Sequence, residues 1–460
     1  MELINQYLSG ALVPFALVFC SILFFARLRG RPMSKPFVII KSLFKKKKGS
    51  GASPIRAVIF ALAGTLGVGN IVGVASAIAL GGAGAVFWMW VSAFFAMILK
   101  YGEVVLAVMH RRLRGQEYCG GAMYYMKDFF KSCKKIGNIF TFAFAILCLI
   151  NGFTMGCIIQ SNAIASSFAS TLGFNEVLVG ALLAILSIIV FFLNGKKIFS
   201  LCERLVPFVS LLYILMSLAV ILPIKDKVPF VFEEILEGAF SFRSAGAGAL
   251  GFFMSKALRY GTIRGLFSNE AGCGSSPIAH ATANTNSAVE QGFLGIFEVF
   301  IDTILICTMT ALVILLNWDS AVYYLSSPIM MAFAAFSGSL GDISNILLSV
   351  SVFLFAFATI VCWGYYGKEC IYFLNPSKRA EKLYYALYVI FVFVGSYISL
   401  DFIWELADFA VGGMTIMNLL IISLMSGEVK RETDLYFEDI RYTKQSLSRK
   451  TTAPFTQGSR

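Results

Sequence analysis

The sequence predicts an all-α polytopic membrane protein with about 11 transmembrane helices. Composition is the first reason, because 58% of the 460 residues are hydrophobic and only 14% are charged. The second reason is the number of apolar runs long enough to cross a bilayer. The third is a pair of glycine-rich interruptions in two of these runs, which predicts a 5+5 inverted repeat whose first and sixth core helices are broken.

The expected spans follow the apolar runs between charged breaks. They lie near residues 8–28, 56–80, 84–108, 139–169, 177–194, 203–223, 240–262, 288–316, 340–372, 384–400 and 402–426. The first run has no basic leader and no small-residue cleavage site, so we interpret it as a retained, extra N-terminal helix. The resulting divisions are this helix (1–30), a basic loop (31–55), the first five-helix repeat (56–223), the second (224–426) and a polar, flexible tail (427–460).

Lys and Arg residues set the expected orientation. They concentrate in the loop after the first span, the loop after the third span and the C-terminal tail. Because basic loops stay in the cytoplasm, we expect an extracellular N-terminus and a cytoplasmic C-terminus. The run at 45–48 (KKKK) and the net charge of +12 then reflect topology and anionic membrane lipid, not nucleic acid.

The two interruptions are GTLGVGN in the second span (64–70) and GAGALGF in the seventh (246–252). A break in a span is tolerated where the backbone lines a cavity. The N–H groups that it frees suit a carboxylate, and the freed carbonyls suit a small cation. Close helix packing through Gly69 and Gly73 explains the glycines equally well at this stage.

Enzyme chemistry is not expected. The ten cysteines are scattered, with no CxxC and no Cys/His cluster, so they resemble small buried apolar residues. The two histidines, His110 and His280, have no sequence partners that would complete a metal site or a catalytic triad. We therefore expect no bound metal and no cofactor, and the absence of a continuous polar face along any span disfavours a channel.

Several long runs resemble the alanine or glycine:cation symporter family, a branch of the amino-acid transporter superfamily. They are GTLGVGNIVGVASAIALGGAGAVFWMWVSAFFAM, GAMYYM, QSNAIA, ERLVPFVSLLY, RYGTIRGLFSNEAGCGSSPIAHA, FAFATIVCWGYYGKEC and WELADFAVGGM, spread from about residue 57 to residue 426. The resemblance implies a leucine-transporter-like fold and secondary active uptake of small neutral amino acids, with sodium or protons as the coupling ion. The family also implies a bacterial or archaeal plasma membrane, and we expect a monomer.

The resemblance also implies site residues. Those expected around the amino acid are Gly67, Gly69, Asn70, Gln160, Asn162, Gly248, Gly251 and Trp363, the last bounding the substrate side chain. Those expected around sodium are Thr65, Gly69 and Thr359. The chain departs from the family pattern at Ala358, where serine is usual, and at Cys157 and Val68. A buried Gln or Asn could instead link helices.

Charged residues inside spans form a separate group of candidates, because each is costly there. Glu298 and Asp302 are four residues apart, so both carboxylates share one helix face and are candidates for proton or cation handling. The alternative is separate pairing, for example with Lys256. Lys100 is expected to extend towards the cytoplasm, and His280 lies in an expected cytoplasmic loop.

Overall fold

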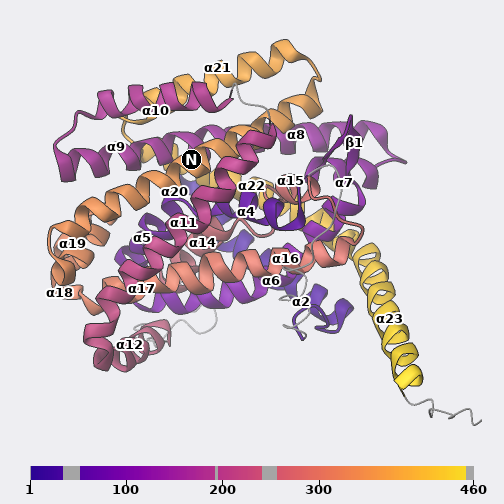
Figure 1. The fold of residues 1–460 in the computed structure, drawn as a ribbon, viewed down its shortest axis with the longest axis horizontal. Helices are drawn as coiled ribbons and strands as arrows, with labels where there is room; N and C mark the ends of the chain where they lie inside the picture. The colour runs from indigo at the N-terminus through magenta and orange to yellow at the C-terminus, as the bar shows by residue number, and fades with distance from the viewer. Residues whose placement is uncertain (1, 35–51, 192–194, 241–255, 452–460) are drawn as a thin grey trace, which may run out of the picture.

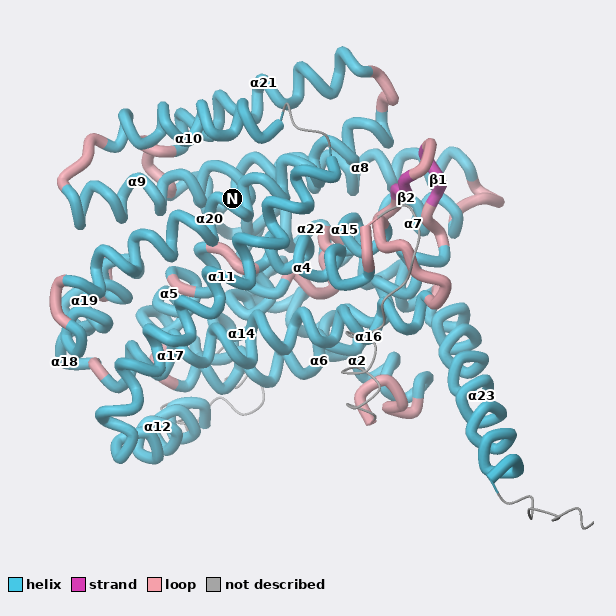
Figure 2. Tube along the Cα trace, viewed as in Figure 1, coloured by secondary structure: helices cyan, strands magenta, loops and turns pink. Residues whose placement is uncertain are grey.

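The computed structural model describes residues 2–34, 52–191, 195–240 and 256–451, which are almost entirely helical (Figures 1 and 2). The first half contains α1 (Glu2–Tyr7), η1 (Leu8–Leu12), α2 (Val13–Leu28), α4 (Pro54–Thr65), η2 (Val68–Asn70), α5 (Val72–Gly81), α6 (Gly84–Met109), β1 (Arg112–Arg114), β2 (Glu117–Cys119), α7 (Ala122–Phe129), α8 (Lys134–Phe153), η3 (Thr154–Ile158), α9 (Ile159–Leu172), α10 (Glu176–Phe191) and α11 (Gly195–Ile221). The second half contains η4 (Leu222–Lys227), α12 (Val228–Phe240), α14 (Lys256–Asn269), α15 (Pro277–Ala281), α16 (Ala288–Val299), η5 (Phe300–Cys307), α17 (Thr308–Leu316), α18 (Trp318–Ala321), η6 (Val322–Tyr324), α19 (Pro328–Leu340), α20 (Ile343–Leu374), α21 (Lys378–Gly395), α22 (Asp401–Leu424) and α23 (Ser426–Thr451).

Seven described helical stretches are long and apolar enough to cross a bilayer, and an eighth is added if α4 and the bent segment after it count as one span. Two further apolar helices, α10 and α19, are shorter. Large apolar side chains such as Leu182, Phe208 and Leu211 are more than half exposed on the outer helices, as expected of a surface that faces lipid. The expected span near 240–262 falls mostly outside the described residues, so the count of about 11 and the inverted repeat stay predictions.

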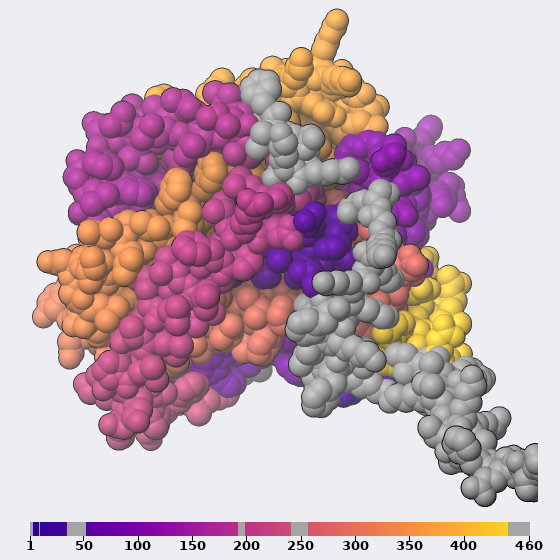
Figure 3. All heavy atoms as spheres, in the orientation of Figure 1, coloured from indigo at the N-terminus to yellow at the C-terminus, as the bar shows by residue number. Residues whose placement is uncertain are grey.

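The long helices form a bundle with α4, α20 and α22 near its centre (Figure 1). Helix α6 packs against α14 and α16 on one side, and α20 packs against α8, α9 and α11 on the other. Helices α10 and α21 pair along the upper edge of the view (Figure 1), while α11 crosses the front face diagonally (Figure 3). This arrangement places the glycine-rich interruption of the first core helix inside the bundle.

A short hairpin lies at one end of the bundle, between α6 and α7 (Figure 2). Its strands β1 and β2 are antiparallel, with Leu113 opposite Tyr118. Arg114 in β1 forms an ion pair of 2.8 Å with Glu369 near the end of α20. The hairpin is thereby fixed to the same end of the molecule as the end of α20.

Within the part of the expected flexible tail that the structure describes, residues up to Thr451 form a helix, α23, which extends away from the bundle (Figure 1). Its first turns are packed, because Val429 and Thr433 are buried. The Thr433 hydroxyl lies 2.7 Å from the Tyr101 hydroxyl of α6, and Asp434 forms an ion pair with Arg31. These contacts with distant parts of the chain stabilise a helix that composition alone does not indicate.

Candidate functional site

The stretch GTLGVGN interrupts the first core helix, as predicted. Helix α4 begins behind Ser53, whose hydroxyl accepts a hydrogen bond from a main-chain N–H of the first turn, and it ends at Thr65. One short turn, η2, follows before α5 begins at Val72, and the two arms are bent by 64°. Every residue from 65 to 71 is buried, so the break lies within the bundle and not at its surface.

Amide side chains bind the N–H groups that the break releases. The Gly67 N–H donates to Asn70 Oδ1 over 3.1 Å, and the Val68 N–H donates to Gln160 Oε1 over 3.1 Å. Gln160 is held from its other end, because its Nε2 donates to the carbonyl of Met155 in the π-helical turn η3. The predicted meeting of Gln160 with the broken helix is therefore present in the structure.

Oxygen atoms gather around Thr359 on the other side of the break. Its Oγ1 lies 2.9 Å from the carbonyl oxygen of Ala63, 3.4 Å from that of Leu66 and 3.1 Å from that of Phe355. Gly67 closes this group, because a Cβ added there would lie 2.7 Å from Thr359 Oγ1 and 3.0 Å from Gln160 Oε1. The carbonyls of Ala63 and Leu66, together with this hydroxyl, suit a small hard cation.

Of the residues expected around sodium, Thr359 lies beside the carbonyls of Ala63 and Leu66, just before and just after Thr65. The Thr65 hydroxyl turns back to its own helix, 3.5 Å from the carbonyls of Ala61 and Leu62. A Cβ on Gly69 would lie 3.5 Å from Ser268 Cα, so this glycine faces α14. Thr359 is therefore close to main-chain oxygens next to Thr65, while the Thr65 side chain faces its own helix.

Asn70 and Asp302 connect the break to the helices behind it. Asn70 Nδ2 lies 2.8 Å from Asp302 Oδ1, and the Ser268 and Thr303 hydroxyls donate to Asp302 Oδ2 over 2.7 and 2.8 Å. Asp302 is therefore a buried carboxylate surrounded by neutral donors. Glu298 belongs to another cluster, so the two carboxylates pair separately, which is the alternative that the sequence left open.

Asn162 is also displaced from the expected site. Its Nδ2 donates to the carbonyls of Gly395 and Ile398, each over 3.1 Å, so it holds the end of α21. It borders a cavity of about 450 Å³ that reaches the break at Val68. The other lining residues come from five elements and their flanking turns: Val72, Ser76, Ile159, Ala163, Ser166, Arg264, Pro328, Ile329, Leu400, Asp401, Trp404 and Glu405.

Trp363 lies one helical turn beyond Thr359 on α20 and is fully buried. Its Nε1 donates to Glu270 Oε1 over 3.1 Å, and its ring packs so closely on Gly156 that a Cβ there would lie 2.3 Å away. Glu270 has a φ of +51°, uncommon for a residue with a side chain, and accepts a second bond from Ser275. Trp363 is thus bonded to the loop after α14 and does not line the 450 Å³ cavity.

A buried charged cluster surrounds Glu298. Its two oxygens lie 3.3 Å from Lys100 Nζ and 2.7 Å from His280 Nε2, while Lys100 Nζ also lies 3.7 Å from Glu103 Oε1. Gln291 Nε2 lies 2.9 Å from His280 Nδ1, so in this arrangement His280 Nε2 carries the proton donated to Glu298.

All four charged or titratable groups of this cluster are fully buried. The expectation that Lys100 extends to the cytoplasm is therefore wrong, and Glu298 pairs with Lys100 and His280 rather than with Lys256, the example given for separate pairing. The segment after α14 folds back into the bundle, and this brings His280 to Glu298.

Sequence reasoning missed Glu270 and the partners of Glu298. The sequence does give an indication of Glu270, because this residue lies in the strongest of the runs that resemble the family. It also gives one of Lys100, which is a charged residue in an apolar run, three residues before Glu103. Gly248 and Gly251, the expected break in the sixth core helix, lie outside the described residues.

The sequence of this chain is similar to the sequences of known proteins over most of its length. The model of the sodium:alanine symporter family matches residues 1–450. The chain is 37% identical to the sodium/alanine symporter AgcS of Methanococcus maripaludis over 84% of each chain. It is 33% identical to the amino-acid carrier protein AlsT of Bacillus subtilis over 88% of this chain and 83% of the relative.

The fold also has a solved counterpart. A substrate-bound, outward-open structure of a Na⁺-coupled sialic acid symporter superposes with a TM-score of 0.58, covering 87% of this chain and 86% of that one, at 12% identity. At that identity the likeness concerns the fold alone. The family match and the relatives establish that the chain belongs to the sodium:alanine symporter family.

Proposed function

We propose that the protein is a sodium-coupled symporter that carries small neutral amino acids, such as alanine or glycine, into the cell. One observation carries this proposal: the cluster of oxygen atoms around Thr359. Gly67 lies between this cluster and the Val68 N–H with its partner Gln160, so the two groups are neighbours. A hard cation and a zwitterion would bind there as neighbours. The name of the Methanococcus maripaludis relative, a sodium/alanine symporter, supports the same pair of ligands, and that of the Bacillus subtilis relative supports an amino acid.

The amino acid would bind at the break through its two charged ends. Its carboxylate suits the main-chain N–H groups of Gly67 and Val68, which now donate to side-chain amides that a ligand would replace. Gln160 offers an amide oxygen for the ammonium group. The close approach of Gly67 to Thr359 and Gln160 leaves little room, which favours a small side chain.

Sodium would bind between the carbonyls of Ala63 and Leu66 and the Thr359 hydroxyl. The hydroxyl oxygen faces the ion when the hydroxyl donates its proton to the Phe355 carbonyl, one turn back on α20 and 3.1 Å away, so that carbonyl is not itself a ligand. Ala358 adds no side-chain oxygen. The ion therefore keeps fewer protein ligands than a neighbouring serine would allow, and a water would complete its shell.

Access to this site differs on its two sides. The 450 Å³ cavity reaches the break at Val68 from the end where α22 begins. Towards the other end, the buried Trp363 is bonded to Glu270. We propose that this contact closes the cytoplasmic side and that its opening, with closure of the cavity, moves the substrate across the membrane.

Proton coupling is the second candidate, favoured by one observation. Glu298 is a fully buried carboxylate bonded to Lys100 and His280, and Glu103 lies beside the same lysine. A change of protonation in such a cluster would alter buried charge and so bias a conformational change. The sodium site is preferred because it adjoins the proposed amino-acid site, whereas Glu298 belongs to a separate cluster.

Uptake of radiolabelled alanine and glycine into proteoliposomes tests the proposal. An inward sodium gradient should drive accumulation, while an equal potassium gradient should not, and Glu298→Gln should retain sodium dependence. Uptake that follows a pH gradient, ignores sodium and is lost in Glu298→Gln would contradict sodium coupling and assign the coupling to protons.

The orientation is a further proposal: a monomer in the plasma membrane with its N-terminus outside and its C-terminus in the cytoplasm. Cys133 gives a direct prediction, because it is exposed between α7 and α8 while the other nine cysteines are buried. A membrane-impermeant maleimide should label inside-out vesicles but not intact cells, and Cys133→Ser should abolish the labelling. Equal labelling of intact cells in a Cys133-dependent manner would reverse the proposed topology.

A further inference from the structure

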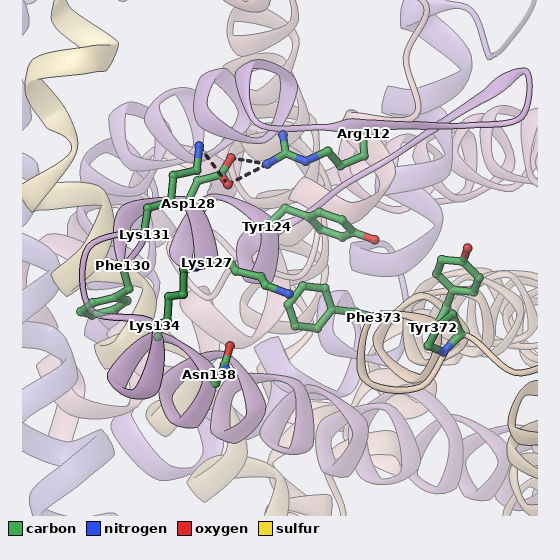
Figure 4. Close-up of a pocket in the computed structure, with 12 residues that line it drawn as sticks. Arg112, Tyr124, Lys127, Asp128, Phe130, Lys131, Lys134, Asn138, Tyr372 and Phe373 are labelled. Carbon is green, nitrogen blue, oxygen red and sulfur yellow. Dashed lines mark hydrogen bonds and ion pairs between the residues drawn. The ribbon is translucent and has the colours of Figure 1, made fainter.

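A basic pocket of about 500 Å³ lies between α7, the start of α8 and the end of α20 (Figure 4). It is well away from the broken helix and plays no part in the proposed transport site. The residues around it are Arg112, Tyr124, Lys127, Asp128, Phe130, Lys131, Lys134, Gly137, Asn138, Tyr372, Phe373 and Pro376. Four of these are basic and one is acidic.

The one acidic side chain is already occupied. Both oxygens of Asp128 lie 2.6 Å from Arg112 Nη2, and one lies 2.9 Å from His110 Nδ1. Lys131 Nζ lies 3.4 Å from the same carboxylate. Desolvation raises the pKa of Asp128, but the hydrogen bonds from His110 and Arg112 outweigh it and the pKa is lowered, so this acid stays charged.

Two lysines of the pocket have no such partner. Neither Lys127 nor Lys134 forms an ion pair with any carboxylate in the described part of the chain. Lys127 Nζ instead lies 5.3 Å from the centre of the Phe373 ring, and Figure 4 shows it directed towards that ring across the pocket. The pocket thus has an excess of positive charge that an anion would neutralise.

Aromatic rings form the walls of the same pocket. Tyr124 and Phe373 meet edge to face at 5.2 Å between ring centres, and Phe130 packs against Phe140 at 5.4 Å. Arg114 lies over the Tyr372 ring at 4.3 Å. A site that combines cations with apolar walls suits a phosphate attached to an organic group better than a small, fully hydrated anion.

The position of the pocket indicates where that phosphate comes from. On α8, just after Lys134, the side chains of Ile136, Ile139 and Phe142 are each more than half exposed. They recur every three residues, so they lie on one face of the helix. An exposed apolar face of this kind faces lipid, and the pocket then lies where the membrane meets water.

We propose that this pocket binds the phosphate group of an anionic phospholipid, with Lys127 and Lys134 as its principal cationic contacts. The helix that begins at Lys134 continues through η3 to α9, which carries Gln160. A lipid bound at its start therefore contacts the same continuous helix that reaches the proposed transport site.

Binding by purified protein in detergent tests this proposal independently of transport. The probes are dioctanoyl phosphatidylglycerol, dioctanoyl phosphatidylcholine and glycerol 3-phosphate, the last having the phosphate without acyl chains. Phosphatidylglycerol should bind tightest, and Lys127→Gln/Lys134→Gln should weaken it about 30-fold, the loss expected from two basic side chains near an anionic lipid. Raising the salt concentration should reduce the difference in phosphatidylglycerol affinity between the wild type and this variant, because salt screens the charges of the lysines.

A matched control is Lys225→Gln/Lys227→Gln, which removes two exposed lysines from η4. It changes net charge equally and should leave binding unchanged. The proposal is overturned if the pocket variant binds phosphatidylglycerol as tightly as wild type, or if phosphatidylcholine binds equally well. If glycerol 3-phosphate binds as tightly as phosphatidylglycerol, the proposal that the phosphate belongs to a lipid is contradicted, and the pocket is assigned to a soluble organophosphate.

Discussion

Replacing Gly67 with alanine is expected to reduce alanine uptake about ten- to hundredfold while the protein remains folded and inserted. The added Cβ would lie 2.7 Å from Thr359 Oγ1 and 3.0 Å from Gln160 Oε1, closer than packed atoms tolerate. To relieve this clash, Thr359 or Gln160 must move, and both side chains are buried and hydrogen-bonded. Overpacking of this kind costs about 1–3 kcal/mol. Each 1.4 kcal/mol or so changes a binding constant tenfold. Here the cost weakens binding at both the proposed amino-acid site and the proposed sodium site.

Two neighbouring glycines supply controls for this measurement. A Cβ at Gly73 would meet no atom within 4 Å, and one at Gly69 would make ordinary contacts of 3.5 Å or more. Gly73→Ala and Gly69→Ala should therefore transport at close to the wild-type rate. If Gly67→Ala matches these controls, the contact between the break and Thr359 does not form the transport site.

Replacing Thr359 with valine is expected to raise the sodium concentration for half-maximal uptake about ten- to hundredfold. Valine keeps the branched shape but removes the one side-chain oxygen among the proposed ligands. Polar contacts to a charged group contribute about 1.5–3 kcal/mol, which converts to this range. Ala358→Ser should shift the sodium requirement in the opposite direction, because it adds a hydroxyl to the same turn of α20.

Thr415 gives a matched control for the valine replacement. It is equally buried, and its hydroxyl bonds to the carbonyl of Val411 in its own helix, away from the break. Thr415→Val should leave the sodium requirement unchanged. An unchanged sodium requirement in Thr359→Val, with transport intact, would place the cation elsewhere.

The sequence predicts the broken helix because the glycines that interrupt it are local, while its polar partners are named only through the resemblance. Clustered glycines mark the break, and the resemblance correctly brings Gln160 and Thr359 to it. Positions within the break are less predictable. Once the chain leaves helical geometry, no periodicity relates residue number to direction, so Gly67 rather than Gly69 faces Thr359.

Long-range contacts account for the other differences. Lys100 and His280 are charged or polar residues whose partners come from other helices, and only the folding of the segment after α14 brings them together. Helix α23 forms at a polar terminus because Thr433 and its neighbours pack on distant residues. Local composition indicates neither the partners of Lys100 and His280 nor the helical state of α23.

An amino acid and sodium are proposed to bind at adjoining parts of one broken-helix site. Binding of radiolabelled alanine to the purified protein, in sodium and in choline buffers, tests it most directly. Because coupling between two ligands is reciprocal, sodium should tighten alanine binding by at least about tenfold and alanine should tighten sodium binding equally. Thr359→Val should lose this coupling while Thr415→Val keeps it. Alanine binding of equal affinity in both buffers would contradict the claim.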